Sequence, residues 1–270
     1  MPVLTISRGS GSGGRMLAER VAERLGFDIV SREEVVHEAA RFGVPEEDLQ
    51  KALLKPPGLW DRFQHQRRRY LAFVQAALCE RVRGGRVVYH GNAGHLLLQG
   101  VSHVACIRLI APVEFRVRML RERSDSTEAE ALEHIQTVDR QRERWTRFLY
   151  GVDWLDPHLY DLCVNLSTLE VDDAVSLVVA LAQAPRFQPT DESRRAMDDL
   201  VLASRVNAAL AADERTSSAE VTLHADGGVV SIRGRLRPAS LVDAVIDVAG
   251  RVPGVERVDR ENLAAPDYTV

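Results

Sequence analysis

A glycine-rich segment near the start of the chain, Arg8–Arg15, has the residue types that bind phosphate. It reads Arg-Gly-Ser-Gly-Ser-Gly-Gly-Arg and therefore contains four glycines, two serines and two arginines. It follows the strand-like run Val3–Ser7 and precedes an amphipathic helix expected from about Met16 to Leu25. A strand, a glycine turn and a helix direct backbone N–H groups and a helix N-terminus toward an anion. The segment therefore predicts phosphate binding.

Two phosphate-binding patterns fit this segment, each with departures. Gly9–Gly14 has the Gly-x-Gly-x-x-Gly spacing of a dinucleotide-binding turn, and the whole segment has the length of a Walker A loop. In the Walker register, Gly13 is the second glycine and Arg8 replaces the first. Gly14 replaces the lysine, and Arg15 replaces the hydroxyl residue that would bind magnesium. A turn without a ligand is the alternative, but each glycine costs backbone entropy on ordering.

An arginine after the second expected strand supports the dinucleotide interpretation. The strand Phe27–Val30 ends at Ser31 and Arg32, where a small residue and an arginine suit the 2′-phosphate of NADP. The run Asn92–Gly94 follows a later strand, as in short-chain dehydrogenases. Those enzymes also need a Tyr-x-x-x-Lys pair, which the sequence lacks. An NADP-dependent reductase is therefore a minor alternative.

The composition is that of an ordinary globular protein. The 270 residues are 45% hydrophobic and 27% charged, with a formal net charge of −4. The length allows two domains, and the charge predicts no general nucleic-acid surface. No apolar run approaches the roughly 20 residues that span a bilayer. The sequence opens on a core strand without a signal peptide, so we expect a cytoplasmic protein without a transmembrane segment.

Cysteines and histidines show no metal-binding spacing. Cys79, Cys106 and Cys163 lie in apolar stretches and are expected to be buried, reduced thiols. His90 and His95 flank a glycine turn, but no carboxylate or cysteine completes a recognisable ligand set. The sequence therefore predicts no metal site.

Strands and helices alternate through the first two thirds of the chain. Further strands are expected at Arg86–His90, His103–Ile110 and Tyr160–Leu166. The nearly continuous apolar run His103–Ile110 is typical of a central strand in a parallel sheet. This alternation predicts an α/β fold with a parallel sheet flanked by helices. The helices between these strands are expected at Arg32–Phe42, from Pro45, at Leu59–Arg83, from Gly91 to Leu98, after Pro112, from Ser126 to Leu149 and at Val171–Ala184.

Two of these helices are rich in arginine. The helix expected from Ser126, as its N-cap, to Leu149 carries Arg140, Arg144 and Arg147 on one face and Arg142 to one side. These could be solvent-exposed charges paired with glutamates along the helix. Near a phosphate loop, however, planar guanidinium groups suit phosphate oxygens and stabilise a transferred phosphoryl group. We favour this second interpretation. The preceding helix adds Arg116, Arg118, Arg121 and Arg123.

A smaller domain with a different order of elements is expected after a linker at residues 185–194. The tight turn Asp226–Gly228 between two strand-like runs is a strong hairpin signal. The elements expected here are a helix at Arg195–Ala211, strands at Glu220–His224 and Val229–Gly234, a helix at Pro238–Ala249 and a strand at Val255–Asp259. Residues 264–270 would be a tail. The order αββαβ predicts a small, separate αβ domain.

The N-terminal part resembles the cytidylate kinase-like family. Ile6–Arg8 and Gly11–Arg15 are similar to the loop of that family, which typically reads Ser-Gly-Gly-Arg where a Walker lysine would stand. A later run carries the more specific resemblance. It consists of Asp139-Arg-x-Arg142, Gly151-x-Asp-Trp154, Asp156-Pro157, Leu159-Tyr-Asp161 and Asn165. The resemblance covers about residues 1–184 and implies the fold of P-loop nucleoside monophosphate kinases.

The resemblance also implies a reaction. The γ-phosphoryl group of ATP, with Mg²⁺, would move to a nucleoside monophosphate such as CMP or dCMP. The residues implied in binding the donor phosphates are Ser10, Gly11, Ser12, Gly13, Gly14 and Arg15. Arg15 would supply the charge of the missing lysine. Ser10, Ser12 or solvent would replace the missing magnesium-binding hydroxyl.

The remaining implied site residues lie farther along the chain. Arg140 and Arg142 would stabilise the transferred group, and Asp139 would orient them or a sugar hydroxyl. Arg32, at a strand end, would hold the acceptor monophosphate. Asn92 stands on the acceptor side, where family members often have arginine. This departure leaves open which acceptor the protein uses.

Residues 195–263 resemble a BON domain. The resemblance rests on Asp226–Gly234, on Val252–Val258 and on the αββαβ order. BON domains are associated with binding phospholipid surfaces or other proteins, which implies such a ligand and a regulatory or sensing role. A domain that only packs or dimerises is the alternative. Arginines alternate along the second strand, either as a basic edge or as charges that block strand pairing; they are Arg233, Arg235 and Arg237.

Two functions therefore stand beside the reductase. The first is a nucleotide kinase with an appended BON-like domain. The second is a weakly active or inactive nucleotide-binding sensor that signals through that domain. They differ in whether Arg15 can replace a lysine and whether Asn92 still permits an acceptor.

Overall fold

The computed structural model of the chain describes residues 1–42, 60–260 and 263–264, with the side chains of all of these except 60–66 and 264. The helix expected to begin at Pro45 lies outside the described residues. The chain forms two compact units. The first consists of Met1–Glu34 and Gly84–Thr190, and the second of Val35–Arg83 and Asp191–Val270. Residues 35–83 therefore group with the C-terminal part of the chain.

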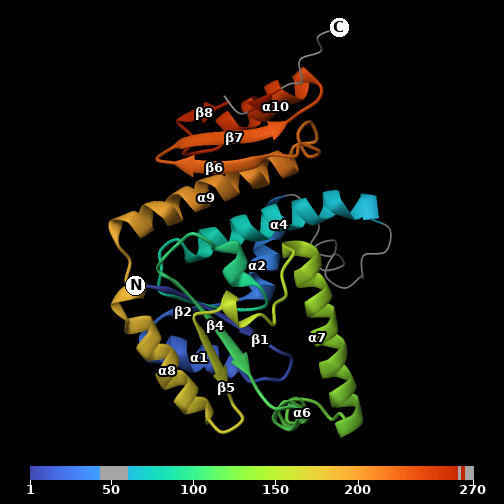
Figure 1. Ribbon diagram of the computed structural model, residues 1–270, viewed down its shortest axis with the longest axis vertical. Helices are drawn as coiled ribbons and strands as arrows, with labels where there is room; N and C mark the ends of the chain where they lie inside the picture. The colour runs from blue at the N-terminus through green and yellow to red at the C-terminus, as the bar shows by residue number, and fades with distance from the viewer. Residues whose placement is uncertain (43–59, 261–262, 265–270) are drawn as a thin grey trace. The chain divides into compact units, whose positions relative to one another are not determined.

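The first unit contains a parallel sheet of five strands (Figure 1). They are β1 (Val3–Arg8), β2 (Asp28–Ser31), β3 (Val87–His90), β4 (Val104–Ile110) and β5 (Leu162–Asn165). Their order is β2-β3-β1-β4-β5, and every pairing is parallel. β4 pairs with β1 on one side and β5 on the other, which confirms the central position predicted for it.

The helices of this unit complete the predicted α/β architecture. They are α1 (Gly14–Leu25), the start of α2 (Arg32–Ala39), α5 (Gly94–Leu97), α6 (Val113–Arg121), α7 (Glu128–Tyr150), η2 (Pro157–Leu159), α8 (Val171–Gln183) and η3 (Pro185–Phe187). Of these, α1, α5 and α8 pack against the strands. Leu17 and Val21 of α1 share a core with Val178 of α8 and with Ile6 and Ile107 of the sheet. Phe187, expected in a linker, also belongs to this core. The predicted fold class is confirmed.

The strand order places the glycine segment where ligands bind in such sheets. The chain leaves β1 toward β2 on one side of the sheet and later passes from β3 to β4 on the other side of β1. In open α/β sheets, ligands bind beyond the carboxyl ends of the strands at the point where the order reverses. Arg8–Arg15 follows the carboxyl end of β1. Topology and glycine content therefore indicate the same location.

The second unit combines two long helices with a small mixed sheet. Its elements are the rest of α2, η1 (Ala40–Phe42), α4 (Trp60–Val82), α9 (Asp191–Ala212), β6 (Thr222–Asp226), β7 (Val229–Arg235), α10 (Ala239–Gly250), β8 (Arg257–Asp259) and β9 (Leu263–Ala264). The predicted hairpin is confirmed, because β6 and β7 are antiparallel and Gly227 and Gly228 have positive φ. The αββαβ order is also confirmed, with β9 as an unexpected addition.

Two expectations about individual positions are wrong. Arg233 and Arg235 do not form a sheet edge, because β7 pairs with β6 on one side and with β8 and β9 on the other. Cys79 is buried as expected, but Cys106 is half-buried and Cys163 is exposed. β5 is an edge strand, so alternate residues along it, Cys163 among them, face solvent.

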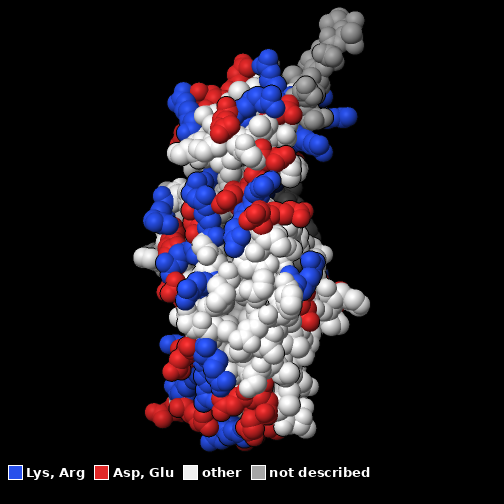
Figure 2. Space-filling model, turned by 90° about the vertical axis from the view of Figure 1, so that its left-hand side faces the viewer, with Lys and Arg blue, Asp and Glu red and all other residues white. Residues whose placement is uncertain are grey.

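Charge and hydropathy of the surface agree with the composition. Figure 2 shows positive and negative side chains intermixed on one face, beside a broad area without charged side chains. In the part of the chain that the structure describes, no helix is both long enough and apolar enough to pass through a bilayer.

Candidate functional site at the glycine loop

The loop between β1 and α1 has a backbone that requires glycine. Gly11 and Gly13 have φ angles of 72° and 78°, in the left-handed region that disfavours other residues. A Cβ at Gly11 would also lie 2.7 Å from the carbonyl oxygen of Arg116, so the loop approaches α6 closely. α1 begins at Gly14, where the first N–H groups of the helix have no partner within it. The predicted geometry of a phosphate-binding turn is therefore present.

Arg8 ends β1, and its side chain runs beside Gly14. A Cβ at Gly14 would lie 1.9 Å from Cδ of Arg8 and 2.8 Å from its Cγ. Nε of Arg8 is buried without a described hydrogen-bond partner, and no described carboxylate forms an ion pair with the guanidinium. Burial is the main cause that lowers the pKa of Arg8, against the opposing charge of Glu33. Arg8 is therefore a partly desolvated cation at the centre of the loop.

Arg142 reaches the same place from α7. Its Nη1 donates a hydrogen bond of 3.0 Å to the carbonyl oxygen of Arg8 and lies 3.9 Å from Oδ1 of Asp139. Burial, together with the positive charges of nearby arginines and against the opposing charge of Asp139, lowers the pKa of Arg142 to about 10; the arginines are Arg8, Arg32 and Arg116. Several guanidinium groups therefore repel one another across this site, which an anion would relieve.

Asp139 and Arg116 together hold the loop at Ser10. Oδ1 of Asp139 accepts a hydrogen bond of 2.9 Å from the backbone N–H of Ser10. Nε of Arg116 donates to the carbonyl oxygen of Ser10 at 2.7 Å, and its Nη2 lies 2.5 Å from Oδ2 of Asp139. Arg116 of α6 and Asp139 of α7 thus both hold the loop by the backbone of Ser10. In this arrangement Asp139 orients Arg116 and the loop backbone.

The cap of α7 differs from the expected one. Thr127, not Ser126, is the N-cap: its side chain accepts from the N–H of Glu130, and the Glu130 side chain accepts from the N–H of Thr127. The reciprocal pair needs a glutamate three residues after the cap, and only Thr127 has one there. This cap fixes the start of the helix that carries Asp139 and Arg142.

The two faces of α7 have different roles. Asp139 and Arg142, three residues apart, face the loop, with side chains 24% and 22% exposed. Arg140, Arg144 and Arg147 lie on the exposed face, and Arg147 pairs with Glu143 at 3.4 Å. These three arginines therefore fit the alternative interpretation from the sequence, in which they are solvent-exposed charges. Helical spacing alone does not distinguish the two faces.

Arg15 does not enter the buried cluster. It lies on the outer side of α1 with a side chain 65% exposed, and its Nε donates to Oε1 of Glu19 at 2.7 Å. This hydrogen bond raises the pKa of Arg15. The catalytic role of Arg15 remains a prediction, whereas Arg8 is the arginine that fills the space beside Gly14.

The residues expected on the acceptor side lie near the carboxyl ends of β2 and β3. Arg32 begins α2 directly after β2, and its charge acts on Arg142. Nδ2 of Asn92 donates to Oγ1 of Thr146 at 3.0 Å, and Thr146 donates to the carbonyl oxygen of Arg142 at 2.8 Å. Oδ1 of Asn92 is buried without a described partner. Asn92 therefore connects the turn after β3 to α7 and keeps one acceptor atom available.

Trp154, Tyr160 and Asp161, from the rest of the run that carries the resemblance, make contacts with β4 or with one another. The guanidinium of Arg108 lies 5.2 Å from the ring centroid of Trp154 and 5.6 Å from that of Tyr160. The hydroxyl of Tyr160 donates to the carbonyl oxygen of Trp154 at 2.8 Å. Asp161 accepts from the N–H of Cys106 at 2.7 Å. These contacts are structural.

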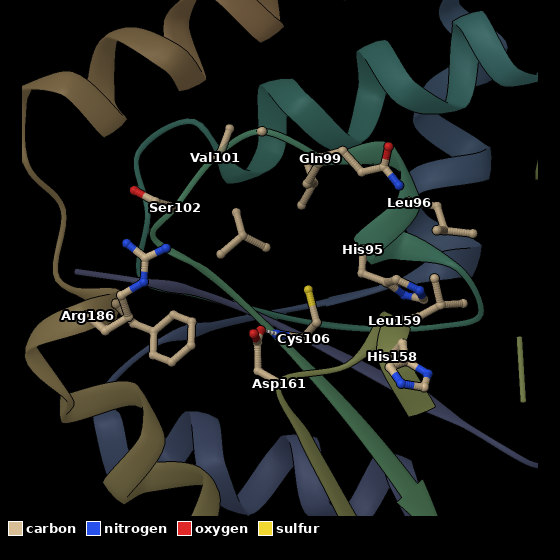
Figure 3. A pocket seen from close by; sticks show the side chains of 14 residues that line it. His95, Leu96, Gln99, Val101, Ser102, Cys106, His158, Leu159, Asp161 and Arg186 are labelled. Atoms are coloured by element: carbon tan, nitrogen blue, oxygen red, sulfur yellow. Dashed lines mark hydrogen bonds between the residues drawn. The ribbon is translucent and has the colours of Figure 1, made fainter. Parts of the chain in front are cut away.

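A separate cavity of about 400 Å³ opens at the opposite ends of the strands (Figure 3). His95, Cys106, Asp161 and Arg186 are among its lining residues, and none of the predicted site residues is. Val104 and Cys106 begin β4 and Asp161 immediately precedes β5, whereas the glycine loop follows the end of β1. Burial lowers the pKa of His95 to about 4 and raises that of Cys106 to about 12. Both side chains are therefore neutral at pH 7.

Sequence comparisons identify both parts of the chain. The sequence model described as the cytidylate kinase-like family matches residues 3–168, and that of the BON domain matches residues 198–264. A protein named cytidylate kinase from Ignicoccus hospitalis is 29% identical over 181 residues, covering 66% of this chain and 97% of that protein. Another of that name from Pyrobaculum islandicum is 28% identical over 178 residues, covering 66% and 90%.

A comparison of structures supports the fold. An uncharacterized protein from Eubacterium ventriosum has a crystal structure that matches with a TM-score of 0.54 and 18% identity. The match covers 68% of this chain and 99% of that one. At this identity the likeness concerns the fold alone.

Proposed function

Because the chain belongs to the cytidylate kinase-like family, we propose that it transfers the γ-phosphoryl group of ATP to a nucleoside monophosphate. One observation carries the proposal: Arg8, Arg116 and Arg142 surround the glycine loop, and Asp139 is the carboxylate within ion-pair distance of two of them. Such an excess of partly buried positive charge favours a multiply charged anion. ATP supplies that anion.

The proposal assigns a part to each element of the site. N–H groups of residues 10–14 and of the start of α1 would bind the donor phosphates. Arg142 would stabilise charge on the transferred group, and Asp139 would hold the loop and Arg116 in place. Arg15 and Arg140 are exposed, so they would supply charge from the surface.

The acceptor would bind near the ends of β2 and β3. Arg32 would contact its phosphate, and the free Oδ1 of Asn92 would accept a hydrogen bond from it or from its sugar. The relatives named cytidylate kinase support CMP or dCMP as the acceptor. Asn92 lacks the charge of an arginine, so binding of the acceptor phosphate would depend more on Arg32.

Mg²⁺ is implied as the companion of ATP. Among the described residues, no group of three or more His, Cys, Asp or Glu side chains gathers. The hydroxyl of Ser12 already donates to the carbonyl oxygen of Gly9 at 3.0 Å, and Arg15 occupies the position of the usual hydroxyl ligand. These residues form no cage for the ion. Mg²⁺ would therefore arrive with the ATP phosphates, as it commonly does.

We also propose a division of labour along the chain. Residues 1–184 would carry the transfer reaction, and the BON-like residues 195–263 would bind a protein or phospholipid ligand. The hairpin and the helices α9 and α10 share a hydrophobic core of their own, which supports a separate binding role for these residues.

An assay of ADP formation tests the proposed reaction. The full chain is incubated with ATP and Mg²⁺ and with CMP, dCMP, UMP, AMP or GMP in turn. We expect ADP formation that a pyrimidine monophosphate stimulates at least tenfold over ATP alone. ATP binding without stimulation by any acceptor would contradict transfer and favour the sensor. One contact favours that second function: Asp139 already occupies the N–H of Ser10, a donor that phosphate would otherwise take.

A further inference from the structure

The arrangement of Arg8 and Gly14 exchanges two positions of a Walker A loop. That pattern has glycine at its first position and lysine after its second glycine. Here arginine stands at the first position, and Gly14 stands at the lysine position. The structure shows why both changes occur together, because Cδ and Cγ of Arg8 lie where a side chain of residue 14 would begin.

We infer that the guanidinium of Arg8 supplies to the donor phosphates the positive charge that a lysine supplies in a Walker A loop. The inference rests on the proposed function and names a residue for it. The side chain enters from the strand end rather than from the helix. The loop therefore keeps one central cation, with arginine at position 8 in place of the first glycine and glycine at position 14 in place of the lysine.

The contacts of Arg8 favour a ligand over a structural role. A structural buried arginine normally has its donors paired. Nε of Arg8 has no described partner, and Arg142 contacts the carbonyl oxygen of Arg8 rather than competing for its guanidinium. The described positive neighbours repel it, and a phosphate between them would provide the missing acceptors.

The other candidates for this role fit less well. Arg15 is 65% exposed and paired with Glu19. Lys51 and Lys55 are the lysines of the chain, and both lie outside the described residues. Arg116 is committed to Ser10 and Asp139. Arg8 alone among these combines a place beside Gly14 with a buried donor, Nε, that has no described partner.

Calorimetric titration with tripolyphosphate and with ATP at one fixed salt concentration tests the inference. Tripolyphosphate presents the phosphate chain without a base. Arg8→Gln should weaken binding of both by about 10- to 100-fold, the loss expected for hydrogen bonds to a charged group. Arg8→Lys should restore most of the affinity. Arg24→Gln, at an exposed position near the far end of α1, should leave binding unchanged.

An exchange variant separates charge supply from folding. Gly14→Lys alone should perturb the loop, because its side chain meets Arg8. The double variant Arg8→Gly with Gly14→Lys recreates the Walker pattern and should bind tripolyphosphate within about threefold of the native chain. Thermal unfolding of each variant shows whether it is folded. This rescue supports the inference even if Arg8→Gln alone fails to fold.

Three results would overturn the inference. They are a folded Arg8→Gln variant that binds as tightly as the native chain, a larger loss for Arg15→Gln than for Arg8→Gln, and a native chain that does not bind tripolyphosphate. Failure of the proposed function looks different. In that case Arg8-dependent binding persists, but no nucleoside monophosphate stimulates ADP formation.

Discussion

Arg142 joins α7 to the glycine loop, and we expect its loss to affect turnover more than ATP binding. Arg142→Ala should lower kcat by about 100-fold or more, because a group that stabilises charge in the transition state contributes on that scale. The Kd for ATP should change by less than about fivefold. Steady-state kinetics and calorimetry measure the two quantities. Arg144→Ala, on the exposed face of the same helix, is the control, and an unchanged kcat in Arg142→Ala contradicts the assigned role.

His95 makes stability depend on pH. It is 6% exposed, its Nε2 has no described partner, and burial lowers its pKa to about 4. The unfolded chain binds the proton near pH 6.5, so the stabilising effect is complete above that pH and is lost as the pH falls toward 4. The free energy of unfolding should fall between pH 7 and pH 5 by about 2 kcal/mol more in the native chain than in His95→Phe.

Urea unfolding at both pH values measures this difference. Phenylalanine cannot titrate and keeps a ring beside Tyr160, which lies 4.8 Å from the His95 ring between centroids. If the free energy of unfolding falls by the same amount between pH 7 and pH 5 in the native chain and in His95→Phe, protonation of His95 does not cause the loss of stability in acid.

Some residues of the site could be predicted from the sequence, and others could not. The glycines, Asp139 and Arg142 could be selected from the sequence, because the loop pattern and the family resemblance mark them. Arg8 could not be placed at the centre of the loop, since its position depends on the empty space beside Gly14. Arg116 could not be distinguished from Arg118 on the same helix, because its contact with Ser10 depends on how α6 packs.

At the level of elements, the start of α7 can be tested directly. Thr127→Ala removes both the acceptor for the N–H of Glu130 and the side-chain bond to Glu130. The free energy of unfolding should fall by about 1 kcal/mol, the usual loss for an N-cap. Ser126→Ala should change it by less than half as much. Chemical denaturation measures both, and equal losses would mean that the capping box does not fix the helix start.

The elements themselves could largely be predicted from periodicity. The strands of the parallel sheet and the hairpin are confirmed, because apolar runs and glycine turns mark them locally. Pairing partners could not be predicted in the same way. β8 pairs with Val229–Ser231 of β7, and β9, a strand of two residues, pairs with Gly234 and Arg235 near the end of β7. Such a short strand leaves no periodic signal.

At the level of the whole molecule, α4 depends on the C-terminal part of the chain. α4 contacts α9 within the second unit, Arg83 pairs with Asp198 at 2.7 Å, and Glu80 pairs with Arg205. The thiol of Cys79 also bonds to Ser204. The sequence could not show this grouping, since residues 35–83 precede the expected linker by a hundred residues or more.

Truncation after Thr190 should therefore destabilise the remaining chain. α4 contacts α9 and carries buried apolar side chains, among them Phe73 and Leu78. Removing α9 should expose part of the apolar surface of α4, which promotes association. Thermal unfolding followed by circular dichroism should show a lower midpoint for residues 1–190 than for the full chain, with increased binding of an apolar dye. A fragment that melts at the midpoint of the full chain would show that residues 1–190 fold independently.

The claim that ATP phosphates bind between β1 and α1 is tested most directly by hydrogen–deuterium exchange of the full chain with and without ATP. Our account predicts slower exchange in peptides that cover residues 8–15, with a smaller effect in those that cover 139–146. Protection confined to other segments, such as the cavity lined by Cys106 and Asp161, with unchanged exchange at residues 8–15, would contradict it.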